Sequence, residues 1–110
     1  MQKYKLKWIT QRITAILLIP LSFWFIYNCL SLTSMTYNEL IVFFNSFLNS
    51  FLFLVMMITT LIHSKIGNET IIDDYIKSKK LKTVFKLLVS IIVYILIIIL
   101  FISIIKILLI

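Results

Sequence analysis

One histidine, one glycine and an acid–tyrosine pair are the candidate functional residues of this 110-residue chain. His63 is the only histidine, Gly67 is the only glycine, and Asp74 and Tyr75 follow closely. On a helix, residues four apart lie on one face. An imidazole with a glycine one turn away suits the edge of a haem, and a carboxylate beside a phenol suits a polar ligand at a membrane surface.

The elements that must position these residues are membrane helices. The chain is 62% hydrophobic with a mean hydropathy of +1.11. Ile13–Asn38, Leu40–Ser64 and Leu87–Ile105 contain no Asp, Glu, Lys or Arg, and each is long enough to cross a ~30 Å hydrocarbon core. Since lipid cannot satisfy backbone polar groups, such tracts must be helical. We therefore predict an all-α, three-transmembrane-helix bundle, with residues 1–110 as one membrane-anchor domain and helices near 13–32, 40–66 and 84–108.

The distribution of basic residues predicts the orientation of the bundle. Of eleven Lys and Arg, ten lie before the first tract or around the second connection, and only Lys106 lies elsewhere. The positive-inside rule then predicts the N-terminus on the cytoplasmic or matrix side and the C-terminus on the opposite side. This topology explains the net charge of +7 without a nucleic-acid partner. The first apolar tract exceeds the core of a cleavable signal peptide, and the twelve residues before it are too few for a typical mitochondrial transit sequence. We therefore expect a bacterial or organelle-encoded multi-pass protein, in the bacterial inner membrane or in the mitochondrial inner membrane.

The second tract carries a polar line. At ~100° per residue, its members fall close to one side of a helix: Asn45, Asn49, Met56, Thr59, His63 and Gly67. Polar side chains in membrane helices face other helices or a cofactor. For the two asparagines we favour packing between helices. In the first tract, Pro20 predicts a kink.

Each candidate residue also has a structural explanation. His63 and Tyr75 could be interface residues at a helix end, Arg12 could extend its charge to the lipid surface, and Gly67 could simply weaken a helix terminus. Acids beside lysines, such as Asp74, are usually solvated. The residue types alone leave these alternatives open.

Two spaced motifs resemble a known family. Trp8, Gln11-Arg12, Thr14-Ala15 and Pro20 resemble the W-x-x-Q-R-x-T-A-x(4)-P opening of small membrane-anchor subunits of succinate dehydrogenase of the alphaproteobacterial and mitochondrial type. The spacing from His63 to Tyr75 resembles that family's H-x(3)-G-x(6)-D-Y signature. Both motifs occur in the family's order, and the resemblance covers nearly the whole chain.

The resemblance implies a role in respiratory complex II. The subunit would be non-catalytic on its own and would bind haem b together with a second membrane-anchor (cytochrome b) subunit. It would anchor an iron–sulfur subunit and a flavoprotein subunit in the lipid bilayer for electron transfer from succinate to ubiquinone. His63 matches one axial haem ligand, and Arg12 matches a position near the haem propionates and quinone pocket. Gly67 is expected to pack on the haem, because the absence of a side chain lets a flat macrocycle lie against the backbone. Tyr75 and Asp74 match quinone-binding positions.

Two rival interpretations remain at this point. In the first, the chain is a small non-redox membrane protein whose histidine and tyrosine are interface residues. In the second, it anchors a fumarate reductase that runs in the opposite direction.

Overall fold

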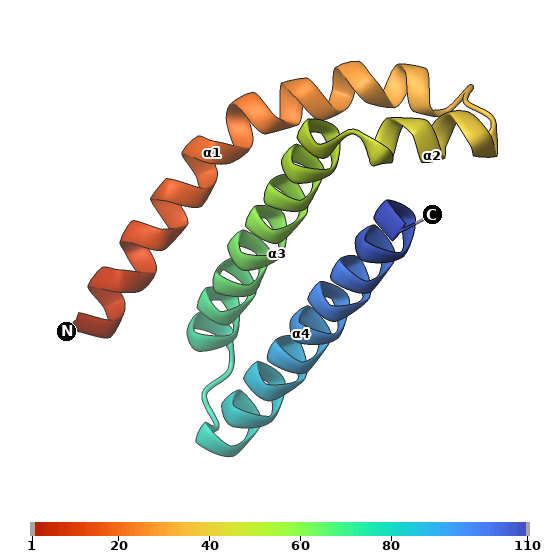
Figure 1. The fold of residues 1–110 in the computed structure, drawn as a ribbon. Helices are drawn as coiled ribbons and strands as arrows, with labels where there is room; N and C mark the ends of the chain where they lie inside the picture. Colours follow the sequence, from red (N-terminus) through yellow and green to blue (C-terminus); the bar gives the residue numbers. More distant parts are fainter. Residues whose placement is uncertain (1, 110) are drawn as a thin grey trace.

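The fold is entirely helical over the residues that the structure describes. The computed structural model describes residues 2–109, with the side chains of residues 5–109. Its elements in chain order are α1 (Gln2–Leu32), α2 (Tyr37–Asn45), α3 (Phe47–Tyr75) and α4 (Lys79–Leu109) (Figure 1). Three segments are long and apolar enough to cross a membrane: Lys5–Leu32, Phe47–Tyr75 and Lys79–Leu109. The predicted all-α fold with three spans is therefore confirmed.

The second predicted helix, over residues 40–66, is not continuous. It is divided at Ser46, whose backbone is extended at φ −67° and ψ 122°. A break in a helix frees backbone carbonyls that lipid cannot satisfy. Here the side-chain amide of Asn49 donates to the carbonyl of Phe43 at 3.1 Å, and the hydroxyl of Ser50 donates to the carbonyl of Phe44. The prediction of one helix is corrected, because two polar side chains replace the missing backbone donors.

This break also corrects the polar line of the second tract. Asn45 ends α2 and does not share a helix with His63. Asn49 serves the backbone at the break and not another helix. The line that remains on α3 includes the buried Met56 and Thr59 and continues to His63.

Helix α3 extends further than the apolar tract that predicted it. It continues through Gly67 and ends at Tyr75, where the N–H of Ile76 bonds the carbonyl of Ile72 at 3.0 Å. The added turns contain no proline, and a single glycine costs a helix only about 1 kcal/mol. As a consequence Asp74 and Tyr75 stand on the helix itself and not on a connection after it.

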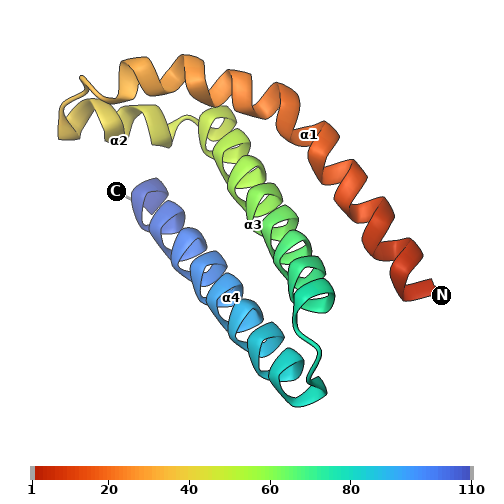
Figure 2. The ribbon, with the colours of Figure 1, turned by 180° about the vertical axis from the view of Figure 1, so that it is seen from behind.

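The N-terminal half of α1 and the whole of α4 lie on either side of α3. Figures 1 and 2 show this order from opposite sides, and they show α1 curving in its middle part toward α2. Pro20 lies inside α1, where its ring removes one backbone hydrogen bond and clashes with the preceding turn. The curve leaves the first turns of α1 beside α3 and carries the remaining turns over α2.

Apolar packing inside the chain is thin. The buried hydrophobic residues are Met56, Val93 and Ile104, while most of the large apolar side chains of α4 remain exposed. The rings of Phe25 and Phe53 join α1 to α3 with centroids 6.1 Å apart. So much exposed apolar surface requires lipid or other protein around it.

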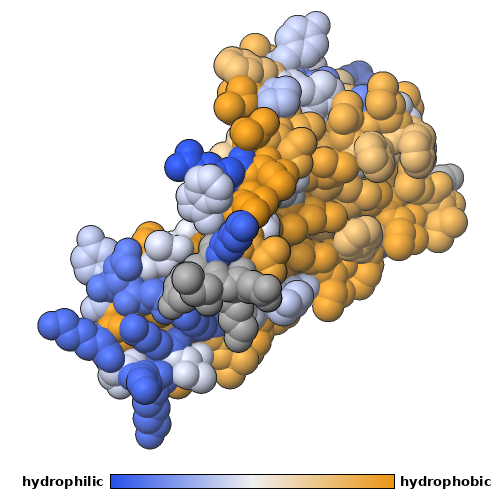
Figure 3. All heavy atoms as spheres, turned by 90° about the vertical axis from the view of Figure 1, so that its left-hand side faces the viewer, coloured by the Kyte–Doolittle hydropathy of each residue, from blue (hydrophilic) through white to orange (hydrophobic). Residues whose placement is uncertain are grey.

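Charged side chains gather at one end of the molecule. Figure 3 shows the hydrophilic surface at the end where α1 begins and where α3 passes into α4, and apolar surface over most of the rest of that face. The first turns of α1 and the last turns of α3 therefore meet at the charged end.

Candidate functional site

The two helices α1 and α3 meet along a stripe of small and polar residues at the charged end. On α1 the stripe contains Gln11 and Thr14, three residues apart, and on α3 it contains His63 and Gly67, four residues apart. The pairs face each other in antiparallel order: Thr14 contacts His63, and Gln11 lies nearest to Gly67. Because i, i+3 and i, i+4 residues share a helix face, the sequence spacing alone places each pair toward one neighbour.

The imidazole of His63 is held from one side by a hydroxyl. Its Nδ1 lies 3.0 Å from the Oγ1 of Thr14, and Thr14 is buried, with 6% of its surface exposed. Among the side chains that the structure describes, none hydrogen-bonds the other ring nitrogen, Nε2. One nitrogen is therefore engaged by α1, and the second has no hydrogen bond among the described side chains.

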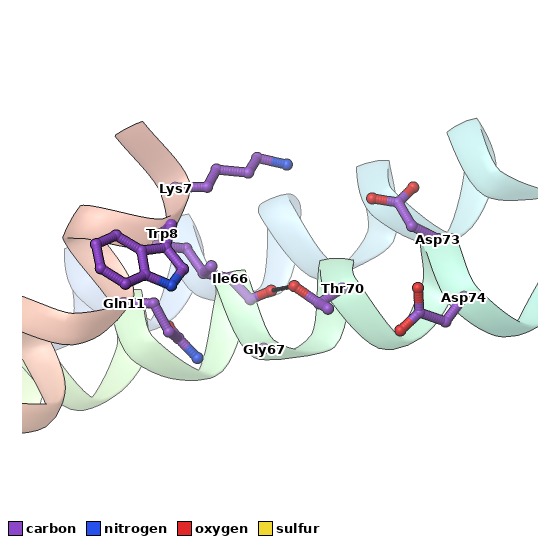
Figure 4. Close-up of a pocket in the computed structure, with 8 residues that line it drawn as sticks. All are labelled: Lys7, Trp8, Gln11, Ile66, Gly67, Thr70, Asp73 and Asp74. Carbon is purple, nitrogen blue, oxygen red and sulfur yellow. Dashed lines mark hydrogen bonds between the residues drawn. The ribbon is translucent and has the colours of Figure 1, made fainter. Parts of the chain in front are cut away.

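A cavity of about 510 Å³ opens beside Gly67. Figure 4 shows that its walls come from α1 on one side and α3 on the other. It is lined by Lys7, Trp8, Gln11, Ile66, Gly67, Thr70, Asp73 and Asp74. A Cβ added at Gly67 would meet only the Nε2 of Gln11, at 3.6 Å, which is ordinary van der Waals contact. None of the described side chains therefore requires a glycine here, and Gly67 lines the cavity.

A buried carboxylate ties α1 to α3 through Lys7, which also lines the cavity. Glu69 is 8% exposed, and its Oε2 lies 2.9 Å from the Nζ of Lys7 on α1. Its Oε1 lies 3.5 Å from the Nζ of Lys65, one turn earlier on α3. The ammonium group of Lys65 also lies 5.7 Å from the centroid of the Tyr94 ring on α4. Glu69 thus anchors a set of charge contacts that joins all three long helices.

This arrangement predicts a loss of stability when Glu69 becomes glutamine. Glu69→Gln leaves Lys7 and Lys65 close together without the charge that holds them. Breaking a fully buried ion pair costs roughly 3–5 kcal/mol, but the side chain of Lys7 is 42% exposed, so we expect about 1–3 kcal/mol. Thermal unfolding of the purified protein in detergent measures the difference. The matched control is Glu39→Gln on α2, where the side chain is exposed; equal melting temperatures for the two variants would contradict the role of Glu69.

The structure separates the acid–tyrosine pair. Asp74 lines the cavity beside Gly67, whereas Tyr75 ends α3 outside the cavity lining and is 82% exposed. Asp73, the residue before Asp74, also lines the cavity. Its Oδ1 lies 2.6 Å from the Nζ of Lys86 on α4. The carboxylate of Asp74 therefore faces the space between α1 and α3, and the phenol is open to whatever covers the end of the bundle.

Arg12 does not line the cavity either. It is exposed, and its guanidinium lies 5.2 Å from the centroid of the Trp8 ring, which does line the cavity. A guanidinium on an indole face is a favourable cation–π contact. Of the predicted site residues, the structure brings His63, Gly67 and Asp74 to the boundary of α1 and α3, and it leaves Arg12 and Tyr75 at the edge.

Two residues of this region, Thr14 and Glu69, were not predicted as site residues from the sequence. Thr14 was noted only as part of a motif, yet it holds the imidazole. Glu69 was not singled out, yet it is the buried charge of the site. A signal existed for the second: an acid four residues after Lys65 on a helix forms an i, i+4 pair.

Comparison with known proteins gives the same family as the two motifs. The family model described as succinate dehydrogenase/fumarate reductase transmembrane subunit matches residues 2–102. The succinate dehydrogenase hydrophobic membrane anchor subunit of Rickettsia bellii (strain RML369-C) is 36% identical over 75 residues, which cover 68% of this chain and 60% of that protein. The anchor subunit of Rickettsia prowazekii (strain Madrid E) is 30% identical over 84 residues, which cover 76% and 67%.

These matches confirm the resemblance read from the motifs at Trp8–Pro20 and His63–Tyr75. The aligned region spans less than two thirds of the Rickettsia bellii relative, but the family match extends over most of this chain. The chain therefore belongs to the succinate dehydrogenase/fumarate reductase transmembrane subunit family.

Proposed function

We propose that this chain is the membrane-anchor subunit of a succinate:quinone oxidoreductase that supplies one axial ligand to haem b and part of the ubiquinone site. The observation that carries the proposal is His63, half-buried at the boundary of two membrane helices, with Nδ1 engaged by Thr14 and Nε2 without a partner among the described side chains. Neutral imidazole nitrogen is a normal ligand of haem iron. Family membership argues against a non-redox membrane protein.

The donor set and the space beside it fit a haem edge. A ligating histidine normally has its other ring nitrogen hydrogen-bonded by the protein, as Nδ1 of His63 is. Gly67, one turn further along α3, lines a cavity whose lining does not include His63 itself. Haem b would supply one-electron transfer when bound. This chain has one histidine, so the second axial ligand would come from the second membrane-anchor (cytochrome b) subunit.

The remaining residues fit a quinone site at the charged end. The phenol of Tyr75 would donate a hydrogen bond to a quinone carbonyl, where negative charge develops during reduction. The carboxylate of Asp74 would accept hydrogen bonds in the pocket and orient its donors. The guanidinium of Arg12, on α1, would form an ion pair with the carboxylates of the haem propionates or lie at the quinone pocket. Because Arg12 and Tyr75 are exposed in this chain, partner subunits would complete both contacts.

Oxidation of succinate requires a flavin, so in this proposal it takes place on the flavoprotein subunit, with an iron–sulfur subunit between flavin and quinone. The chain itself anchors those subunits in the inner membrane. By the positive-inside rule, the charged end with Lys7 and Lys79 would face the cytoplasm or matrix. The family description includes fumarate reductase, and the direction of the reaction would be set outside this chain.

Substitution of Gly67 by alanine tests the proposal. Because a Cβ meets only Gln11 at 3.6 Å, and alanine favours a helix over glycine by about 1 kcal/mol, we expect Gly67→Ala to assemble and melt like the parent complex. The content of b-type haem per complex should fall, since the added methyl group enters the cavity. The measurement is the reduced-minus-oxidised optical spectrum of the purified complex, with Ser64→Ala as the control on the same helix. Unchanged haem content in Gly67→Ala, or a parent complex that contains no b-type haem, would contradict the proposal.

A further inference from the structure

Thr14 holds its hydroxyl in a position that fixes the chemical form of the neighbouring histidine. We infer that Thr14 is a positioning residue: it keeps His63 in the tautomer with hydrogen on Nδ1 and so leaves the lone pair on Nε2, the nitrogen that would hold the haem iron. This inference rests on the proposed role of His63 as a haem ligand. It concerns a residue of α1, a helix that supplies no ligand of its own.

The Oγ1 of Thr14 has one hydrogen and three hydrogen-bond contacts. A threonine hydroxyl has one hydrogen to donate and two lone pairs with which to accept. The Oγ1 of Thr14 lies 2.8 Å from the carbonyl oxygen of Thr10 and 3.0 Å from that of Gln11. Carbonyl oxygens accept and never donate, so the single hydrogen of the hydroxyl points toward these two groups.

With that hydrogen directed at a carbonyl, the third contact of the same oxygen fits an accepted hydrogen bond. The Nδ1 of His63 lies 3.0 Å away, and an N–H on Nδ1 would complete a hydrogen bond to this oxygen while the hydroxyl keeps its bond to a carbonyl. A neutral imidazole carries hydrogen on one nitrogen alone. Hydrogen on Nδ1 leaves the lone pair on Nε2, which is the atom without a partner among the described side chains.

Burial makes this hydrogen bond hard to replace. Thr14 is 6% exposed, so water has little access to the oxygen. The hydroxyl is tied to the backbone of α1, which fixes the place of the acceptor and with it the rotation of the imidazole ring. Hydrogen bonds of this kind orient a ligand and raise its basicity, and their loss typically lowers metal affinity or activity about 10-fold to 100-fold.

The test replaces the hydroxyl while the shape is kept. Thr14→Val removes the acceptor, Thr14→Ser retains it, and Thr60→Val is the matched control. Thr60 donates to the carbonyl of Met56 in the same i, i−4 pattern, so its variant loses a similar bond on α3 without touching the histidine. All variants are examined in the purified complex by electron paramagnetic resonance of the low-spin haem and by redox titration of its optical spectrum.

We expect Thr14→Val to change the g values of the haem, because the ring of His63 loses the contact that fixes its rotation. The midpoint potential should rise, since a less basic imidazole favours ferric iron less. A tenfold loss of preference for ferric haem corresponds to about 59 mV. Thr14→Ser should restore both properties toward those of the parent, and Thr60→Val should leave them unchanged.

Two results would overturn the inference. If Thr14→Val matches Thr60→Val in g values and potential, the hydroxyl serves only the packing of α1. If Thr14→Val and Thr14→Ser disturb the haem equally, side-chain shape and not the hydrogen bond is responsible. In both cases His63→Ala separates this failure from that of the proposed function: an altered haem spectrum in His63→Ala retains the ligand assignment, whereas an unaltered one removes it.

Discussion

Replacement of His63 by alanine is expected to leave the complex assembled and to remove its normal low-spin haem. The variant loses the only imidazole of this chain, so the iron keeps at most the ligand from the partner anchor. Loss of a group that merely supports a ligand costs about 10-fold to 100-fold in metal affinity, and loss of the ligand itself should cost at least as much. We therefore expect haem to be absent or to become high-spin.

The fold of the chain should survive this substitution. His63 makes one hydrogen bond within the described residues, to Thr14, which is worth about 1 kcal/mol. The ion contacts of Glu69 with Lys7 and Lys65 lie further along the same boundary and remain in place. Subunit content on a native gel reports assembly, and Ser64→Ala, at the next position of α3, is the control. A variant that keeps the parental low-spin spectrum would show that the ligand lies elsewhere.

The second large effect is expected at Tyr75. Tyr75→Phe removes the phenol and keeps the ring, so membrane insertion and succinate oxidation with a soluble artificial acceptor should stay near the parental rate. Quinone reduction should fall several-fold to tens-fold, because a hydrogen bond is worth about 0.5–1.5 kcal/mol and more to a charged oxygen. The measurement is the rate of quinone reduction over a full range of quinone concentrations.

Two further variants test whether the loss of quinone reduction is specific to the site at Tyr75. Tyr27→Phe removes the phenol of another exposed tyrosine, which is 77% exposed on α1, and should have no effect. Asp74→Asn should lower quinone reduction without affecting the soluble acceptor, because Asp74 lines the cavity beside Gly67. Parental quinone kinetics in both Tyr75→Phe and Asp74→Asn would mean that Tyr75 is an interface anchor and that quinone binds elsewhere.

The sequence determines the presence of the helices better than it determines where they end and which residues they bring together. Long uncharged tracts force helices in lipid whatever surrounds them, so the three spans were predictable from composition. The family could be predicted from two motifs, because both match the family in residue type and in the spacing between residues. Where α3 ends could not be read from the apolar tract, since helix formation continues through polar residues such as Glu69 when no proline stops it.

Contacts between helices could not be predicted from the periodicity of apolar and polar residues. The break at Ser46 depends on Asn49 and Ser50 reaching back to free carbonyls, and a polar residue in an apolar tract is equally compatible with packing against another helix. The contact between Thr14 and His63 joins residues 49 positions apart. Its prediction requires the register of two antiparallel helices, which a single sequence does not contain.

Chemical rescue of a His63→Gly variant tests whether His63 is the haem ligand. Glycine leaves a space for an imidazole molecule at the position of the lost ring. The variant complex is titrated with imidazole during haem loading, and the optical and paramagnetic resonance spectra are followed. We expect low-spin haem to be lost in His63→Gly and to return saturably with added imidazole. A parental low-spin spectrum in His63→Gly without imidazole, or no return at any concentration in a complex that remains assembled, would contradict it.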